Sequence, residues 1–364
     1  MPRAGGFFCT DMLGKIKQLV TEGFPPRKNF PPGMPGLLKY LHAIYEDLPA
    51  GLVRIMKWQP LFALGTSILV LFLFRKGFEY VPLTIVSVIF AFFYITFRLY
   101  LLKEKKGLIT SLWDTALIFI INNMLLFVLP FYFESMTFPS RNMLFAPLII
   151  GLSVIANWFT LYQRAIERHP LRSSVFYALT FFCVLNFIFP IVFGMRNIRS
   201  LLASGGIAAL AVVLFVLPHT DIRRDRKNML LYLAGLVLSF AFLWFGRSLI
   251  PPAPLKLTGS TACAGIESFK PEGPFKTTRA DNAREVYFYS SIFAPRGLSE
   301  KIDHVWYHNG RKLLSISLDE IRGGRKEGFG TWSKRFLLEG PGTYTVEVWT
   351  AGGQLLGTGG FVAY

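Results

Sequence analysis

Asp114 is the residue whose surroundings most favour chemistry, because it is the only carboxylate inside a long apolar run. It lies six residues into that run, and Arg98 lies four residues from the end of the preceding run. At ~1.5 Å per helical residue, the two side chains would lie about 9 and 6 Å deep in a membrane, where they can pair. One interpretation is a carboxylate that couples transport to a proton or an ion. We favour the other, a structural clasp between helices, because a coupling site normally contains more ionisable groups.

Further polar side chains lie in the interiors of the apolar runs. They are Asn122, Asn123, Ser153, Asn157, Thr160 and Asn186. Ser153, Asn157 and Thr160 follow the spacing i, i+4, i+7 and therefore form one stripe on a helix. Such a stripe can line the cavity of a transporter. More often it forms interhelical hydrogen bonds worth about 1 kcal/mol each, and this is the interpretation that we favour.

The C-terminal tail contains its own binding candidates. Arg322, Arg325 and Lys326 lie in a Gly-rich segment between two predicted strands, and His308 lies upstream of them. This cationic loop would suit an anionic envelope polymer, a lipid headgroup or a protein partner. The alternative is an ordinary solvated loop.

No catalytic residue, metal ligand or cofactor site is predicted. His304 and His308 would share a face of one strand with Trp306, but they lie about 13 Å apart by strand rise, too far to hold one metal ion. No histidine falls within an apolar run, so serine–histidine chemistry in the membrane is unsupported. A membrane enzyme could use only Glu79 and Glu134, near the outer ends of the first three runs.

The amino-acid composition indicates whether lipid or water surrounds these residues. The 364 residues are 52% hydrophobic, with a mean hydropathy of +0.42 and a formal net charge of +17. That apolar excess has to face lipid. The cations lie in short loops between apolar runs, which argues against a nucleic-acid partner. Cys9, Cys183 and Cys263 show no paired spacing, although Cys263 could pair between chains.

Seven apolar runs of at least 17 residues each must position the intramembrane groups. The runs are 58–74, 80–102, 108–133, 143–161, 175–195, 201–217 and 229–250. Lys and Arg residues number 18 in the N-terminal segment and the even loops, but 6 in the odd loops with Arg247. This asymmetry predicts a cytoplasmic N-terminus and, after an odd number of crossings, an external C-terminal tail.

The sequence divides into three predicted domains. Residues 1–57 form a cytoplasmic amphipathic segment, residues 58–250 the transmembrane domain, and residues 251–364 a β domain. Apolar residues in the last part recur with period two, which is typical of strands. The seven predicted strands are 255–266, 285–293, 303–308, 312–318, 331–338, 343–350 and 354–362. Their number and size favour an immunoglobulin-like sandwich, with a hairpin turn at Asn309-Gly310 and a tyrosine corner at Tyr344.

Motif residues of the tail point to a family. They are Trp306, His308, Thr331, Trp332, Ser333, Lys334, Gly342, Tyr344, Val346, Leu356, Gly357, Phe361 and Val362. This pattern resembles a bacterial domain-of-unknown-function family found at the C-termini of envelope proteins, and the apolar part is similar to a multispan region that accompanies it. The resemblance implies an uncharacterised bacterial inner-membrane protein with a C-terminal Ig-like domain. The family pattern has Arg before Thr331, where this sequence has Gly330.

The sequence therefore predicts an α-helical polytopic membrane domain of about seven spans, followed by an all-β immunoglobulin-like sandwich. We expect a bacterial inner-membrane protein whose periplasmic sandwich binds or scaffolds an envelope partner, either a protein or a polymer. Lipid surrounds the helices, and homo-oligomers are possible. One alternative is a transporter of a small solute or ion that uses Asp114 and the Asn-rich span interior. Another is a membrane-embedded enzyme, although enzymatic activity is the less favoured expectation.

Overall fold

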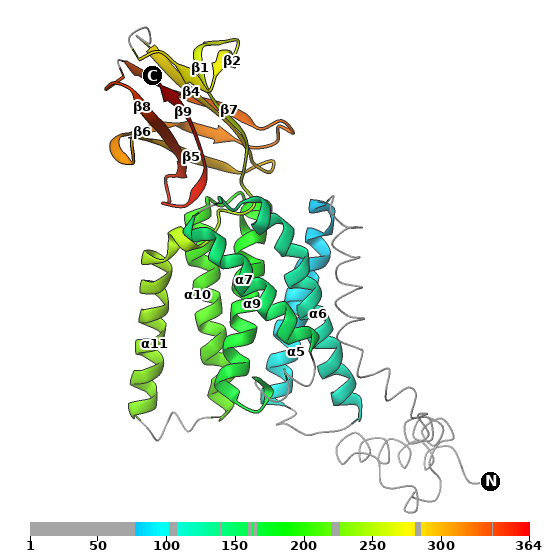
Figure 1. Ribbon diagram of the computed structural model, residues 1–364. Coiled ribbons are helices and arrows are strands. Elements are labelled where there is room, and N and C mark those ends of the chain that lie inside the picture. Colours follow the sequence, from blue (N-terminus) through cyan, green and yellow to red (C-terminus); the bar gives the residue numbers. More distant parts are fainter. Residues whose placement is uncertain are drawn as a thin grey trace, which may run out of the picture. The chain divides into compact units, whose positions relative to one another are not determined.

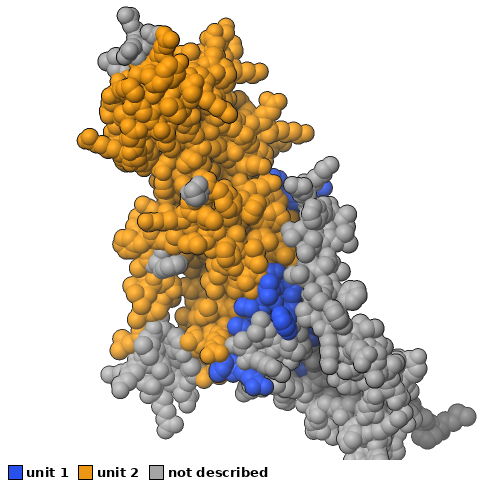
Figure 2. Space-filling model, viewed as in Figure 1, with its two compact units in different colours: residues 1–124, 153–170 blue, residues 125–152, 171–364 orange. Residues whose placement is uncertain are grey.

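The computed structural model arranges helices before strands along the sequence (Figure 1). By its internal contacts the chain divides into two compact units, residues 1–124 with 153–170 and residues 125–152 with 171–364 (Figure 2). The larger unit includes the described strands and the last three described α-helices. The described residues are 77–101, 108–138, 140–158, 162, 166–219, 226–280, 285–336 and 338–364.

Four of the described helices are long and apolar enough to cross a membrane. They are α5 (Val81–Tyr100), α6 (Leu108–Glu134), α9 (Pro170–Phe193) and α10 (Asn197–Val216). The other described α-helices are α7 (Phe145–Asn157) and α11 (Arg226–Phe245). Short 3-10 helices flank them: η2 (Phe78–Tyr80), η3 (Arg141–Leu144), η5 (Leu217–His219) and η6 (Arg247–Leu249). Apolar helices of this length indicate a membrane protein.

The described helices support four spans rather than about seven. The predicted runs 143–161 and 229–250 correspond to shorter apolar helices, Arg141–Asn157 and Ala234–Phe245. In the first case hydropathy overestimates the length, because α7 ends at Asn157, whose amide donates to the carbonyl of Ser153 at 3.1 Å. The predicted run 58–74 and the amphipathic segment 1–57 lie outside the described residues.

Glycine brings α10 and α11 into contact. A Cβ atom placed on Gly205 would lie 2.0 Å from Leu243 Cδ1, and one on Gly206 would lie 3.3 Å from Phe240 Cζ. The missing side chains therefore let Leu243 and Phe240 of α11 pack against the backbone of α10. Small residues serve the same purpose wherever apolar helices pack in lipid, because lipid removes the hydrophobic drive for association.

Among the described residues, nine strands form two sheets in the C-terminal part of the chain. They are β1 (Lys256–Glu267), β2 (Lys270–Phe275), β3 (Thr277–Thr278), β4 (Glu285–Phe293), β5 (Ser299–His308), β6 (Arg311–Arg322), β7 (Phe329–Phe336), β8 (Gly342–Thr350) and β9 (Leu355–Ala363). The strand orders are β2-β1-β4-β7 and β3-β9-β8-β5-β6. Each of the seven predicted strands overlaps an observed one. The sequence missed β2 and the two-residue β3, because β2 contains Pro271, Gly273 and Pro274, which proteins tolerate mainly at a sheet edge.

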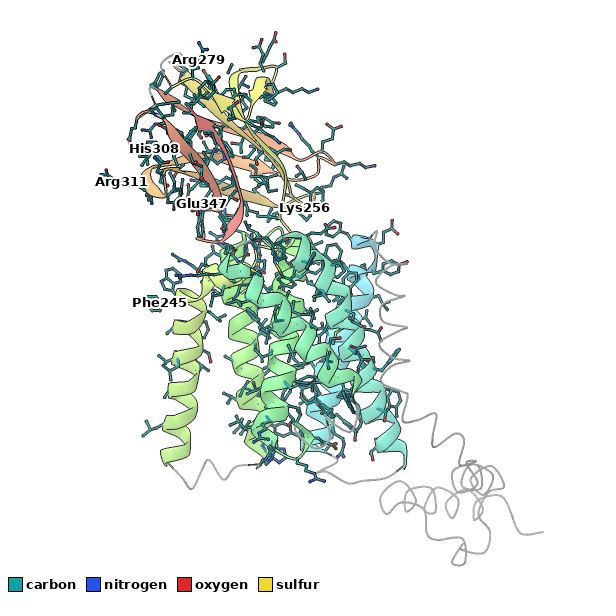
Figure 3. All side chains as sticks on the ribbon, viewed as in Figure 1. Phe245, Lys256, Arg279, His308, Arg311 and Glu347 are labelled. Carbon is teal, nitrogen blue, oxygen red and sulfur yellow. The ribbon has the colours of Figure 1, made fainter. Side chains whose placement is uncertain are left out.

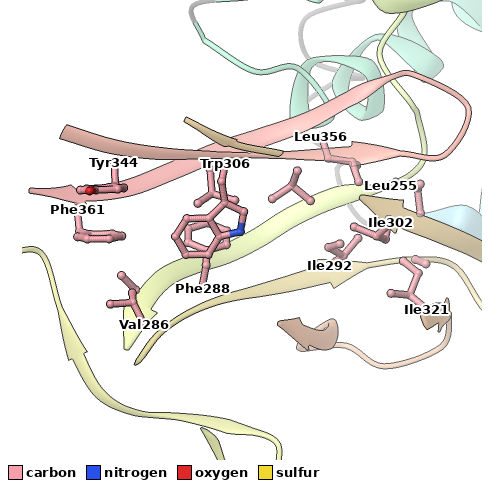
Figure 4. Packing of buried hydrophobic residues seen from close by; sticks show 14 of the residues in the cluster. Leu255, Val286, Phe288, Ile292, Ile302, Trp306, Ile321, Tyr344, Leu356 and Phe361 are labelled. Carbon is pink, nitrogen blue, oxygen red and sulfur yellow. The ribbon is translucent and has the colours of Figure 1, made fainter. Parts of the chain in front are cut away.

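The two sheets share one apolar core (Figure 4). Phe288 of β4 and Trp306 of β5 are fully buried, and their ring centroids lie 6.2 Å apart across the core. Phe275 of β2 meets Phe361 of β9 edge to face at 5.6 Å. Period-two alternation along the strands supplies these inward side chains and leaves the intervening residues on the outer faces.

The hairpin between β5 and β6 turns at Asn309-Gly310, as the sequence predicts. Both residues have positive φ, +48° and +80°, and the strands pair on either side at His308 and Arg311. The Asn309 side chain also accepts the backbone N–H of Thr343 at 2.9 Å, which ties the turn to the start of β8.

Candidate functional site

Aromatic side chains and a lysine form a row on the outward face of the β2-β1-β4-β7 sheet. Tyr287 and Tyr289 project from β4, while Trp332, Lys334 and Phe336 project from β7. The register places Tyr289 opposite Trp332 and Tyr287 opposite Lys334. These five residues, called the aromatic face below, extend about 13 Å along the strands at ~3.3 Å per residue. Sequence reasoning missed the face, although their period-two spacing was a signal that could have identified it.

Several side chains of this face pack on one another. The Lys334 ammonium lies 4.3 Å from the ring centroid of Phe336 and 5.7 Å from that of Tyr287, within reach of a cation–π interaction. Phe269 meets Trp332 at 5.8 Å. Phe269 and Phe336 are 74% and 59% exposed, so the aromatic surface is open to a ligand.

The cationic loop adjoins one end of the aromatic face. Arg322, Arg325 and Lys326 are all exposed, as expected for a binding loop and equally for a solvated one. The Arg325 guanidinium lies 4.9 Å from the ring centroid of Phe329. Burial raises the pKa of Tyr289, and the positive charge of Arg325 opposes that shift, which places Arg325 near the phenol.

Hydrogen bonds hold the backbone of this loop. The hydroxyls of Ser291 and Thr258 donate to the carbonyl of Glu327 at 2.8 and 3.2 Å. Its amides at Gly323 and Gly324 donate to carbonyls of the β4–β5 connection at 2.9 Å. The cationic side chains therefore project from a backbone anchored at both ends.

Gly330 has a steric role beside this loop. A Cβ atom there would lie 2.3 Å from the Tyr289 hydroxyl and 2.9 Å from its ring. The Tyr289 ring thus occupies the space where any side chain at position 330 would begin. Because Gly330 has no side chain, it leaves the Tyr289 ring in place and adds no cation to the loop.

The histidine of the β core is buried and takes part in a hydrogen-bond network. His304 is fully buried, with its ring nitrogens 2.9 Å from Ser290 Oγ and 2.8 Å from Ser333 Oγ. The Trp306 indole N–H donates to the same Ser333 oxygen at 3.0 Å. Burial lowers the pKa of His304 to about 3, so the imidazole is neutral at ordinary pH.

His308, which is labelled in Figure 3, packs against neighbouring residues of the β region. Its ring stacks on Tyr344 at 4.5 Å and 13°, and Tyr344 stacks on Phe361 at 5.0 Å and 5°. A ring nitrogen of His308 lies 3.2 Å from the carbonyl of Pro341. His308 therefore closes the end of an aromatic column.

Asp114 and Arg98 meet, and a tyrosine joins them. Arg98 Nε lies 3.3 Å from Asp114 Oδ1, and the Tyr94 hydroxyl donates to the same oxygen at 2.7 Å. Phe90 and Trp113 lie beside this group, with ring centroids 5.9 Å apart. Two donors on α5, the Tyr94 hydroxyl and the Arg98 guanidinium, thus contact the Asp114 carboxylate of α6.

The polar residues of the helix interiors fall into separate local clusters. Asn122 Oδ1 accepts from Ser153 at 2.7 Å and from Asn157 at 2.8 Å, and Asn123 donates to the carbonyl of Phe119 on its own helix. Asn122 lies eight residues beyond Asp114, about 12 Å along α6. The predicted stripe thus joins Asn122 through two members, while its third, Thr160, lies outside the described residues.

Asn186 belongs to a network between α6 and α9. Its amide donates to the Tyr132 hydroxyl at 3.0 Å, and that hydroxyl donates to the carbonyl of Cys183 at 2.8 Å. All three residues are buried, so the hydrogen bonds satisfy polar groups that lipid could not.

A second set of contacts that sequence reasoning missed joins the strands to α10. The first turn of α10 contains no acidic residue, and its N-cap, Arg196, makes no side-chain cap. Instead the backbone N–H of Asn197 donates at 2.8 Å to a carboxylate oxygen of Glu300, a buried residue of β5. Arg196 pairs with Glu320 of β6 at 2.7 Å. Because Glu300 is 103 residues from Asn197, no local sequence signal could have revealed this cap.

Burial raises the pKa of Glu300, and the backbone N–H groups of Asn197 and Lys301 oppose the rise. A carboxylate at this position favours the helix, because the N-terminus of a helix carries partial positive charge. Glu300, Glu320 and their partners on α10, together with the contacts that follow, are called the junction below. Its remaining contacts are Asn142 Nδ2 to the Leu355 carbonyl at 3.0 Å, Gln354 Nε2 to the Ile250 carbonyl at 2.9 Å, Asn197 Nδ2 to the Pro252 carbonyl at 2.7 Å, and Lys256 to Glu134 at 3.4 Å.

Two more candidates from the sequence have defined surroundings. Cys263 has no exposed surface, and burial raises the pKa of its thiol, so pairing between chains would require the strand to open. Glu79 is exposed in η2, and Glu134 forms the ion pair with Lys256. Among the described residues, no three His, Cys, Asp or Glu side chains lie close enough to hold a metal ion.

Comparison with known families matches nearly the whole described chain. Residues 59–289 match a family of unknown function, DUF5924, and residues 299–362 match a protein of unknown function, DUF2914. No curated protein matches the sequence. The first match ends within β4 and the second begins at the first residue of β5, although side chains from both regions build one β core. Since the first match covers more than half of the residues, the chain belongs to the DUF5924 family of unknown function.

Proposed function

We propose that this chain is a bacterial inner-membrane protein whose C-terminal β region lies in the periplasm and binds or scaffolds an envelope partner. The observation that carries the proposal is the aromatic face with its adjoining cationic loop. Aromatic residues and arginine are enriched where proteins bind partners, and lone solvated loops do not explain a row of rings on a sheet. Phe269 and Phe336 would lose most of their exposed surface in such a complex.

The proposed orientation rests on the cation distribution. Seven crossings, including the run 58–74, would leave 18 basic residues on the cytoplasmic side and 6 on the other. The helices α7 and α11 are shorter, and a short apolar helix can cross where the bilayer thins around it.

An immunoglobulin-like assignment of the β region has two supports. The sheets β1-β4-β7 and β9-β8-β5-β6 divide the strands as such sandwiches do. The Tyr344 hydroxyl accepts the N–H of Glu339 at 2.8 Å and donates to the carbonyl of Gly340 at 3.0 Å, which is the contact expected of a tyrosine corner.

The junction suits a scaffold. Ion pairs and buried hydrogen bonds tie β5, β6 and the β8–β9 turn to α10 and its neighbours, instead of leaving a free linker. A partner bound to the β region would therefore be held at a fixed place relative to those helices.

Two experiments in cells test the proposal. Alkaline phosphatase fused after Tyr364 is expected to be active, because that enzyme folds only outside the cytoplasm; a silent fusion would reverse the orientation. A photo-crosslinking residue at Phe336 is expected to capture an envelope component. The matched control is Tyr364, 64% exposed and outside the face, where capture of the same component would contradict a specific site.

A further inference from the structure

The aromatic face has a chemical character that narrows the partner. Its five side chains are four aromatic rings and one ammonium, so the face offers ring surfaces and hydrogen-bonding edges and contains no aliphatic side chain. Tyr289 and Trp332 lie side by side on β4 and β7, and Tyr287 lies about 7 Å further along β4. The Tyr287 hydroxyl donates to a carboxylate oxygen of Glu285 at 3.0 Å.

The charges lie at defined places along this row. Lys334 occupies one end, where it also meets Glu285 at 3.7 Å. Arg325 lies near Tyr289 at the other end, where Lys326 and Glu327 follow it in the sequence. Because Glu285 already faces Lys334, the excess of positive charge is at the loop end, and an anionic ligand would be oriented by it.

We infer that the aromatic face binds an acidic polysaccharide, whose sugar rings stack on Tyr287, Tyr289 and Trp332 while its carboxylates pair with Lys334 and the cationic loop. Pyranose rings present C–H faces that pack against aromatic rings, and their hydroxyls pair with phenol and indole edges. A polymer repeats this unit along its length, which matches a row of rings better than a single pocket. The inference rests on the proposed function and names the class of its partner.

Binding to the full chain in lipid nanodiscs tests this inference, since glycoside detergents would compete for the rings. The probes are hexagalacturonate, neutral cellohexaose and a hexaglutamate peptide, titrated by calorimetry. Hexagalacturonate is expected to bind most tightly. Trp332→Ala should weaken it roughly tenfold, while Trp332→Phe should restore much of the affinity. Tyr364→Ala, which removes an exposed ring elsewhere, should change nothing.

A second variant tests how much the positive charge of the face contributes to binding. Lys334→Gln is expected to weaken hexagalacturonate severalfold and to leave cellohexaose unchanged. Unaltered binding by Trp332→Ala, or binding of hexaglutamate as tight as that of hexagalacturonate, would overturn the inference. Hexaglutamate binding alone would indicate an acidic protein partner and leave the proposed function standing. If no probe binds and Phe336 captures nothing in cells, both the inference and the proposed function fail.

Discussion

His304 shows how a residue suited to catalysis can serve packing instead. Both ring nitrogens meet serine hydroxyls in a core from which water is excluded. Ser333, a motif residue, bonds to both His304 and Trp306, while its neighbours Trp332 and Lys334 face outward. The Trp-Ser-Lys segment thus contributes to the core and to the surface at once.

The depressed pKa of His304 predicts acid sensitivity of the β region. Above pH 6.5 the imidazole is neutral in both states and adds no pH dependence. As the pH falls from 6.5 towards about 3, the unfolded chain binds a proton that the folded core excludes, so the free energy of unfolding falls, by up to about 1.4 kcal/mol per pH unit. His304→Gln should flatten this slope in thermal melts followed by tryptophan fluorescence. His169→Gln, at an exposed histidine, should leave it intact; equal slopes for all three proteins would contradict the assignment.

Glu300 predicts a stability effect at the start of α10. Glu300→Ala removes a buried acceptor from the Asn197 N–H and should cost about 1–3 kcal/mol of unfolding free energy. Hydrogen exchange at Asn197 should accelerate as well. Glu320→Gln breaks only the half-exposed pair with Arg196 and should cost less than ~1 kcal/mol. A larger loss from Glu320→Gln would show that the surface pair, rather than the cap, holds the junction.

At the scale of elements, glycine decides which helices pack. Gly205→Val would drive its side chain into Leu243 and should separate α10 from α11, with a loss of about 1–3 kcal/mol. Gly235→Ala on α11 is the matched control, because nothing lies within 4 Å of its Cβ position and alanine favours helix. Cysteine crosslinking between the two helices measures the separation. Retained crosslinking in Gly205→Val would contradict this account of the contact.

At the scale of the whole molecule, two sequence families build one folded region. The core of β5, β8 and β9 is completed by Leu255, Val286 and Phe288, which precede the second family match. Phe288 packs on Trp306, with ring centroids 6.2 Å apart, so a fragment without Phe288 leaves part of the Trp306 ring uncovered.

A fragment of residues 299–362 is therefore expected to remain unfolded, whereas residues 251–364 should fold. The shorter fragment cannot bury the same aliphatic and aromatic side chains, and it therefore loses a stabilisation of roughly 25 cal/mol for each Å² of apolar surface that stays exposed. Amide NMR spectra distinguish the two, since dispersed resonances require a packed core. A dispersed spectrum of 299–362 would show that the second family match is an independent domain.

Local patterns in the sequence determined much of this architecture. Hydropathy identifies α5, α6, α9 and α10, period-two alternation identifies seven of nine strands, and Asn309-Gly310 identifies a hairpin, because each signal depends on neighbours within a few residues. The same reasoning placed the end of one helix too late, since the apolar run 143–161 extends beyond Asn157, where α7 ends.

Tertiary structure alone decided which distant side chains meet. Period-two spacing marks Tyr289 and Trp332 as outward residues, but only the pairing of β4 with β7 makes them one surface. Glu300 precedes the predicted strand 303–308 and carries no signal of its own in the sequence, and only its contact with Asn197, 103 residues away, makes it the cap of a helix. Register and docking depend on long-range packing, in which the partner's place is fixed by the whole chain, and no short segment of sequence contains that information.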